Sequence, residues 1–160
     1  MKEMIKKIWF DMDGTIADLY GVEGWLESIR AGQVTPYIVA TPMVNLSLLA
    51  RLLNQLQREG WELGIISWGA RNATPTFQYD TEVAKIQWLN MHMPSVHWDS
   101  IKVVRHGLNK YEQCKGGILF DDEQQNRDSW EDLAYEPNYI IDVLKQILHN
   151  NRTAHEMVIE

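Results

Sequence analysis

The residues best suited to chemistry are two aspartates, Asp11 and Asp13, which stand two positions apart and precede Gly14. They directly follow the largely apolar residues 5–10, whose end at 8–10 predicts a buried strand. Open α/β sheets bind their ligands at the carboxyl ends of strands, so both carboxylates are placed for binding. Two close carboxylates repel each other, and a bound divalent cation relieves the repulsion. The competing interpretation is an ordinary Asp-Gly turn.

Other polar residues follow other apolar segments in the same way. Ser67 comes directly after a predicted strand at 61–66, and Asp121 and Asp122 come directly after another apolar segment. Lys110 lies in the connection that precedes that second segment. Because the carboxyl ends of parallel strands converge at one edge of a sheet, all these side chains are expected to share one crevice. Each of these residues also has an ordinary interpretation when it is taken alone. Ser67 is then a turn residue, Asp121 and Asp122 cap the following helix, and Lys110 is a surface lysine.

This set of residue types suits phosphoryl transfer. Asp11 can attack phosphorus to form an aspartyl phosphate, while Asp13 can protonate the leaving oxygen and later take a proton from water. The hydroxyl and backbone amide of Ser67 can bind phosphoryl oxygens, and Lys110 offsets negative charge. Trp68, the next residue after Ser67, is a further candidate for the phosphate site. Mg²⁺ prefers hard oxygen ligands, so the remaining acids are its expected ligands.

The composition indicates one globular domain. Of the 160 residues, 45% are apolar and 23% are charged, and the formal net charge is -7. This acidic balance argues against strong nonspecific binding to nucleic acid, whose phosphates attract clustered Lys and Arg. Cys114 is the only cysteine, which excludes an internal disulfide and favours a cytoplasmic location. No membrane segment and no signal peptide are expected.

Hydrophobic spacing predicts strands that alternate with helices. Beyond the first strand, the expected helices and strands are helices 21–31, 44–59, 81–91 and 137–148 and strands 61–66, 101–105, 117–120 and 133–135. Residues 33–43, with Pro36 and Pro42, are expected to form an irregular connection. The alternation predicts a parallel sheet with right-handed crossovers in one catalytic domain over 1–150, followed by a flexible tail at 151–160.

Taken together, these motifs resemble the haloacid dehalogenase-like (HAD) hydrolase superfamily. The four motifs of that superfamily are matched in order by residues 11–15, Ser67, Lys110 and the acid pair at 121 and 122. The resemblance implies an α/β, Rossmann-like three-layer sandwich with a mainly parallel sheet, dependence on Mg²⁺ and a nucleophilic role for Asp11. It also implies a metal site that is formed by four acids, Asp11, Asp13, Asp121 and Asp122. Within the last pair, Asp122 is preferred to Asp121 as the metal ligand.

The lengths of the connections imply little or no cap domain over the site. Residues 16–41 offer one short helix, and residues 68–109 are largely used by the core. By analogy with the family, such an open site accepts bulky substrates or is closed by a second subunit in a homo-oligomer. Arg71 and Asn126 are candidate substrate contacts. The segment 81–122 also resembles the 5′(3′)-deoxyribonucleotidase branch, although that branch carries a larger helical cap.

The sequence therefore predicts a cytoplasmic, Mg²⁺-dependent phosphatase that hydrolyses a phosphate monoester through an aspartyl phosphate on Asp11. The substrate is a phosphorylated small molecule or macromolecule, and phosphorylated nucleic-acid ends and phosphoproteins are the alternatives within this class. An alternative of another class is a regulatory module that binds phosphate and metal without catalysis. A receiver-like domain is less favoured, because its accepting aspartate normally lies on a later strand.

Overall fold

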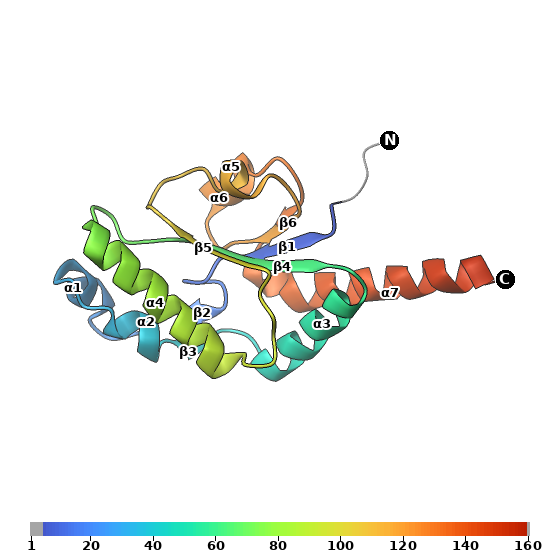
Figure 1. The fold of residues 1–160 in the computed structure, drawn as a ribbon, viewed down its shortest axis with the longest axis horizontal. Helices are drawn as coiled ribbons and strands as arrows, with labels where there is room; N and C mark the ends of the chain where they lie inside the picture. The colour runs from blue at the N-terminus through green and yellow to red at the C-terminus, as the bar shows by residue number, and fades with distance from the viewer. Residues whose placement is uncertain (1–4, 160) are drawn as a thin grey trace.

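A five-stranded sheet occupies the centre of the protein, and helices cover both of its faces (Figure 1). The computed structural model describes residues 5–159 and the side chains of residues 5–152. The strands of the sheet are β1 (Lys7–Phe10), β4 (Glu62–Trp68), β5 (Ser100–Val104), β6 (Ile118–Phe120) and β7 (Ala134–Tyr135). Their spatial order is β5-β4-β1-β6-β7, and each neighbouring pair is parallel. The expected α/β fold with a mainly parallel sheet is confirmed.

The strands place side chains alternately in two hydrophobic layers. The helices are α1 (Trp25–Arg30), α2 (Thr35–Val39), α3 (Leu46–Arg58), α4 (Pro75–His92), α5 (Lys110–Cys114), α6 (Gln124–Ser129) and α7 (Ile140–Ile159), with a 3-10 turn η1 (Pro137–Tyr139). Ile8 and Phe10 of β1 pack in a core shared with α3, α4 and α7. Trp9 points to the opposite face, which α5 and α6 cover. This alternation follows from the two-residue repeat of a strand.

The α3 helix confirms the helix expected from leucine spacing. Asn45 caps it, because its side-chain oxygen accepts a hydrogen bond from the backbone N–H of Leu48 at 3.1 Å. The leucines buried on its inner face are Leu49, Leu52, Leu53 and Leu56. Each fully buried leucine contributes roughly 1.5–3 kcal/mol, so this row holds α3 against the sheet.

The α4 helix begins earlier than the sequence predicts. The expected helix at 81–91, capped by Asp80 or Thr81, is the second part of a helix that begins at Pro75. Its true N-cap is Thr74, whose hydroxyl accepts a hydrogen bond from the backbone N–H of Phe77 at 3.1 Å. Proline fits the first helical turn because its missing N–H has no partner there. In residues 75–80, Pro75, Phe77 and Tyr79 alternate with polar residues, so spacing at the helical period does not mark these turns.

Two short helices, α1 and α2, lie beside the amino-terminal half of α4 (Figure 1). The expectation of an irregular connection at 33–43 is wrong in part, because Pro36 stands in the first turn of α2 and starts a helix there. Tyr37 of α2 packs with Phe77 and Ala84 of α4 in a small apolar cluster. The antiparallel strands β2 (Ala17–Asp18) and β3 (Thr41–Pro42) pair at the ends of this region. In the described part of the chain, α1 and α2 are the helices between β1 and α3.

The α7 helix is longer than the helix expected to end near residue 148. It continues to Ile159, through residues that the sequence analysis assigned to a tail. No glycine or proline follows Leu148, so no residue type in this stretch opposes continuation of the helix. The predicted division into a domain at 1–150 and a tail at 151–160 therefore does not coincide with the end of a helix.

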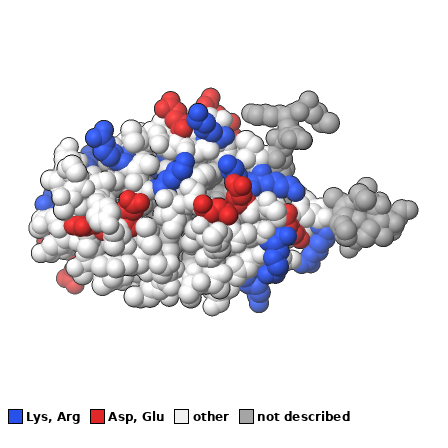
Figure 2. All heavy atoms as spheres, in the orientation of Figure 1, with Lys and Arg blue, Asp and Glu red and all other residues white. Residues whose placement is uncertain are grey.

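The surface carries charges of both signs. Figure 2 shows acidic and basic side chains interspersed over one face of the molecule, between larger uncharged areas. Across the described part of the chain, no helix combines the length and the apolar character needed to cross a membrane. The single cysteine, Cys114, is buried and free, and burial raises the pKa of its thiol to about 12.

Candidate active site

The polar residues singled out in the sequence meet at the carboxyl ends of the three central strands. β1 runs into Asp11, β4 ends with Ser67 and Trp68, and β6 runs into Asp121. β1 lies between β4 and β6. The chain moves outward from β1 through β4 to β5 and then crosses to β6 on the other side of β1. Such a reversal of strand order opens a crevice where parallel sheets bind ligands.

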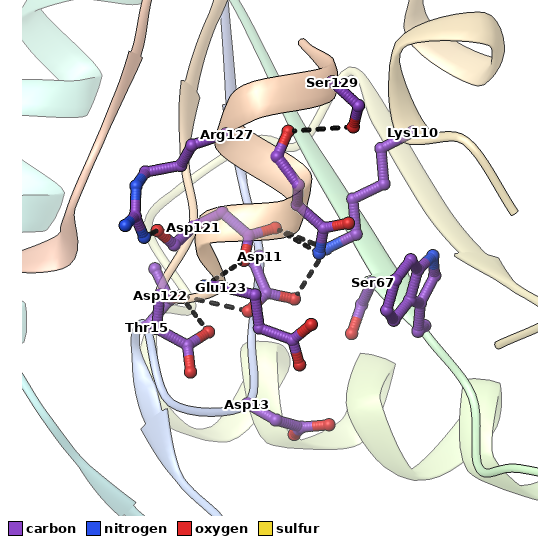
Figure 3. Close-up of polar contacts among 12 residues, drawn as sticks. Asp11, Asp13, Thr15, Ser67, Lys110, Asp121, Asp122, Glu123, Arg127 and Ser129 are labelled. Atoms are coloured by element: carbon purple, nitrogen blue, oxygen red, sulfur yellow. Dashed lines mark hydrogen bonds and ion pairs between the residues drawn. The ribbon is translucent and has the colours of Figure 1, made fainter. Parts of the chain in front are cut away.

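Lys110 joins the two central acids (Figure 3). Its Nζ lies 3.0 Å from Oδ1 of Asp11 and 2.6 Å from Oδ2 of Asp121, and all three side chains are buried. Asn109 sets this position by capping α5, since its side chain accepts a hydrogen bond from the backbone N–H of Glu112 at 3.0 Å. Burial lowers the pKa of Lys110, but Asp11 and Asp121 outweigh it and raise the pKa above its usual value. Lys110 is therefore a fixed positive charge.

Asp11, Asp121 and Asp122 form an acidic cluster. One carboxylate oxygen from each lies within 4.8 Å of those of the other two, a spacing that fits a metal ion. The oxygens of Asp121 accept hydrogen bonds from Lys110, from the amide of Asn126 at 3.2 Å and from the backbone N–H of Glu123 at 2.9 Å. Asp122 has fewer such donors: the Thr15 hydroxyl, which has one proton, lies 3.3 Å from Oδ1 of Asp122 and 3.0 Å from Oδ2 of Asp11. Asp122 is thus better placed to offer an oxygen to a cation than Asp121.

The acidic cluster binds protons tightly because it holds unbalanced negative charge. Burial, a hydrogen bond to Asp11 and repulsion from Asp11 and Asp121 raise the pKa of Asp122 to about 8. Burial and repulsion from Asp11 raise the pKa of Asp121 to about 6, although Lys110 opposes the rise. A divalent cation would replace such protons, and carboxylate oxygens are the hard ligands that Mg²⁺ prefers. The residues present fit Mg²⁺.

Asp13 lies apart from the acidic cluster. Figure 3 shows its carboxylate below the three clustered acids, and its Oδ2 accepts a hydrogen bond from Nζ of Lys85 at 3.0 Å. Burial raises the pKa of Asp13, Lys85 lowers it and Asp11 raises it, with a net upward shift. The structure therefore places Asp13 beside a lysine, where the sequence analysis expected a metal ligand.

The loop after β1 is shaped around the acidic cluster. The hydroxyl of Thr15 lies 3.0 Å from Oδ2 of Asp11, which helps to hold that carboxylate in place. Gly14 has a φ of 79°, in the left-handed region, and a Cβ at this position would collide with the Asp122 carboxylate. Glycine is required here for the conformation of the turn and for the approach of Asp122.

A cavity of about 720 Å³ opens beside Asp11, Asp13 and Lys110. Trp68 lines it in a fixed orientation, because its indole N–H donates to the carbonyl of Leu108 at 2.9 Å and its ring lies 5.4 Å from Nζ of Lys110. The indole N–H is therefore not available to a phosphoryl group. Two residues expected from the sequence to contact the substrate, Arg71 and Asn126, also line the cavity. Of these, Asn126 holds Asp121.

Ser67 is fully buried at the end of β4, and its Oγ accepts a hydrogen bond from Nζ of Lys85 at 2.6 Å. Lys85 belongs to α4 and is a charged residue of the site that the sequence did not predict. It stands on the buried face of α4, three or four positions from Thr81, Trp88 and Leu89. A lysine among the residues that share the buried face of a helix is the signal that could have revealed this role. A buried lysine requires hydrogen-bond acceptors or an acid as partners.

Comparisons with models of known protein families and with curated protein sequences find no match. The class of protein is therefore defined by fold and site alone. The protein is an α/β protein with a parallel sheet, a cavity at the carboxyl ends of its central strands, and three acids beside that cavity that could hold a metal ion.

The raised pKa of Asp122 predicts how stability depends on pH and Mg²⁺. In the metal-free protein, folding keeps a proton on this carboxyl that the unfolded chain releases near pH 4. This contribution to stability is full below pH 4 and is lost as pH rises through about 8. Asp122→Asn should abolish this loss of stability at high pH. It should therefore raise the melting temperature of the metal-free protein at pH 8.5 by about 3 °C, after allowance for the partial solvent exposure of the side chain.

Thermal melts at pH 5.5 and pH 8.5, with EDTA or Mg²⁺, test this expectation. Mg²⁺ should raise the melting temperature of the unsubstituted protein at pH 8.5 and should have a much smaller effect on Asp122→Asn. Asp128→Asn, at an exposed position on α6, is the matched control. An equal Mg²⁺ response in the Asp122 variant would show that this carboxylate is not a metal ligand.

Proposed function

We propose that this protein is a Mg²⁺-dependent phosphatase that hydrolyses a phosphate monoester through an aspartyl phosphate on Asp11. The observation that carries the proposal is the position of the Asp11 carboxylate, which borders the cavity, contacts Lys110 and belongs to the acidic cluster. A nucleophile, a positive charge and a candidate cation site thus lie around one point. The resemblance to HAD hydrolases assigns the same role to Asp11.

In the first step, a carboxylate oxygen of Asp11 attacks phosphorus, and the bond between phosphorus and the leaving oxygen breaks. The leaving oxygen takes a proton from Asp13 and departs as an alcohol. The raised pKa of Asp13 favours the protonated form that this step requires. Asp13 also borders the cavity, so its carboxyl can reach a leaving group bound there.

In the second step, water attacks the phosphorus of the aspartyl phosphate and gives a proton to Asp13. The bond between phosphorus and Asp11 breaks, which releases inorganic phosphate and restores the Asp11 carboxylate. Both side chains thereby return to their starting states. Asp13 serves as acid in the first step and as base in the second. One carboxyl group can do both when the leaving oxygen and the attacking water lie on the same side of the phosphorus.

Negative charge at the reacting phosphorus requires compensation throughout. Lys110 supplies one fixed positive charge against Asp11. Asp11, Asp121 and Asp122 would hold Mg²⁺, which when bound supplies further positive charge beside the phosphoryl group. The Ser67 hydroxyl is the expected donor to a phosphoryl oxygen. These groups stand in place before substrate arrives, so little reorganisation is needed.

The size of the cavity favours a substrate larger than a phosphate group. Trp25, Tyr37 and Phe77 form apolar parts of its lining, and Arg30 and Arg71 add positive charge. An aromatic leaving group with an additional negative charge would complement this lining. Phosphorylated nucleic-acid ends and phosphoproteins remain the alternative substrates, and the reducing cytoplasm remains the proposed location.

Hydrolysis of an aryl phosphate, measured with Mg²⁺ and with EDTA, tests the proposed function. Turnover should require Mg²⁺, and a panel of phosphorylated metabolites, nucleotides, oligonucleotides and peptides should then identify the preferred leaving group. Acid quenching during turnover should capture phosphorylated protein. Phosphate binding without any turnover would favour a regulatory module, and a long-lived acyl phosphate would favour a receiver-like domain.

A further inference from the structure

Lys85 is a second buried lysine at the site, and its ammonium group is completely used by the protein. Only 1% of its surface is exposed. Its Nζ lies 2.6 Å from Oγ of Ser67, 2.9 Å from the carbonyl oxygen of Trp68 and 3.0 Å from Oδ2 of Asp13. These three acceptors match the three protons of an ammonium group. The ring of Tyr37 lies 5.0 Å from the same nitrogen and covers it further.

The contacts of Lys85 differ in kind from those of Lys110. Lys110 contacts the proposed nucleophile and borders the cavity, whereas Lys85 is not among the described residues that line it. With three protein acceptors, Lys85 has no proton left for a substrate oxygen. Any influence of Lys85 on the reaction must therefore pass through the groups that it holds, and two of these belong to the proposed machinery.

We propose that Lys85 is a positioning residue, which fixes Asp13 and turns the Ser67 hydroxyl into a hydrogen-bond donor for a phosphoryl oxygen. Because Nζ donates to Ser67 Oγ, the hydroxyl proton must point away from Lys85. Among the described residues, the hydrogen bond with Lys85 is the one that Ser67 Oγ makes. Ser67 is fully buried and is not among the described residues that line the cavity, so a phosphoryl oxygen must enter beyond the cavity surface to accept this proton. This inference rests on the proposed function, since it assumes that a phosphoryl group occupies the site.

Lys85 also links two segments that are far apart in the sequence. Asp13 follows β1, Ser67 ends β4, and α4 connects β4 to β5. Without the ammonium group, Asp13 would lose the only ion pair that it forms among the described residues, and the Trp68 carbonyl would lose a donor. Burial and Asp11 raise the pKa of Asp13 and Lys85 lowers it, so loss of the ammonium group would favour the protonated Asp13 carboxyl. No ion pair would then hold this carboxyl in place.

A double-mutant cycle on the binding of inorganic phosphate tests the inference. Phosphate affinity is measured by calorimetry with Mg²⁺ for the unsubstituted protein, Lys85→Met, Ser67→Ala and the double variant. Each single substitution should weaken binding about tenfold, as loss of a hydrogen bond to a charged group does. In the Lys85→Met background, Ser67→Ala should then change the affinity less than threefold. An equal effect of Ser67→Ala in both backgrounds would refute the positioning role, as would unchanged affinity in Lys85→Met.

Controls separate positioning from folding. Lys85→Met is expected to lower the melting temperature, because it leaves Asp13 without its cationic partner. The double variant Lys85→Met with Asp13→Asn removes both charges and should recover much of that loss. Its phosphate affinity should nevertheless stay about tenfold below that of Asp13→Asn alone. Equal phosphate affinities of these two variants would refute the effect of Lys85 on Ser67, because Lys85 would then act only through Asp13.

The cycle also distinguishes this inference from the proposed function. A protein that binds phosphate with the expected coupling but hydrolyses no ester would retain the role of Lys85 and contradict catalysis. A protein with turnover and additive effects would retain catalysis and contradict the role of Lys85. Absence of phosphate binding in the unsubstituted protein would overturn the inference. Lys85→Arg, which keeps the charge, should restore part of the affinity lost in Lys85→Met.

Discussion

Asp11→Asn is expected to lower the turnover of an aryl phosphate by at least about 10³-fold while the protein remains folded. The amide cannot attack phosphorus, so the covalent intermediate cannot form. Asparagine has nearly the same shape as aspartate, and its side-chain oxygen can still accept a hydrogen bond from Lys110 or Thr15. Loss of function should therefore occur without loss of structure.

Steady-state kinetics and acid quenching measure this effect together. Label from the substrate should appear on the unsubstituted protein during turnover and should be absent from Asp11→Asn. Asp128→Asn provides the matched control, because it makes the same chemical change at an exposed position. Undiminished turnover by Asp11→Asn would exclude the aspartyl phosphate mechanism.

Lys110→Met is expected to cause the largest combined loss of stability and activity. The substitution leaves the carboxylates of Asp11 and Asp121 buried without their shared cation. Removing one partner from a buried ion pair typically costs about 3–5 kcal/mol, which for a chain of this length lowers the melting temperature by roughly 10 °C. Turnover should also fall, because the reacting phosphoryl group loses a fixed positive charge.

Denaturant unfolding and kinetics on Lys110→Met separate the two effects when a second variant is added. Lys110→Met with Asp121→Asn removes one of the unpaired charges and should recover part of the stability, while activity stays low. Lys102→Met is a control on the same side of the sheet. It is suitable because Lys102 is only partly buried and its ammonium group contacts the Gln113 carbonyl. A stable and active Lys110→Met protein would contradict the assigned role.

The sequence was sufficient to predict the acids at the strand ends because the signal is local. An apolar strand followed at once by aspartates occurs before Asp11 and again before Asp121, and parallel strands bring such ends together. The α3 helix was predictable for the same reason, since its leucines repeat at helical spacing. Ser67 could be placed by its position at the end of β4, although the hydrogen bond that it accepts from Lys85 could not be predicted.

Lys85 was missed because its partners lie far away in the sequence. Spacing of apolar residues predicts that Val83, Ile86, Trp88 and Leu89 face the sheet. Trp88 and Leu89 are buried, whereas Val83 and Ile86 are only half-buried, and the buried face also contains Thr81, Ala84 and Lys85. Burial of a lysine depends on Asp13, 72 residues away, and on Ser67, 18 residues away. No local pattern contains that information, and no apolar spacing at the helical period marks the first turns of α4.

The order of the strands has a consequence for the newly synthesised chain. β1 pairs with β4 along one edge and with β6 along the other. Between the end of β4 and the start of β6 a ribosome adds about 50 residues, which takes roughly 3–10 s. During that interval the backbone of the central strand has one open side, which can pair with a foreign strand. Chaperone occupancy of nascent chains should therefore peak before residue 118 emerges and then decline.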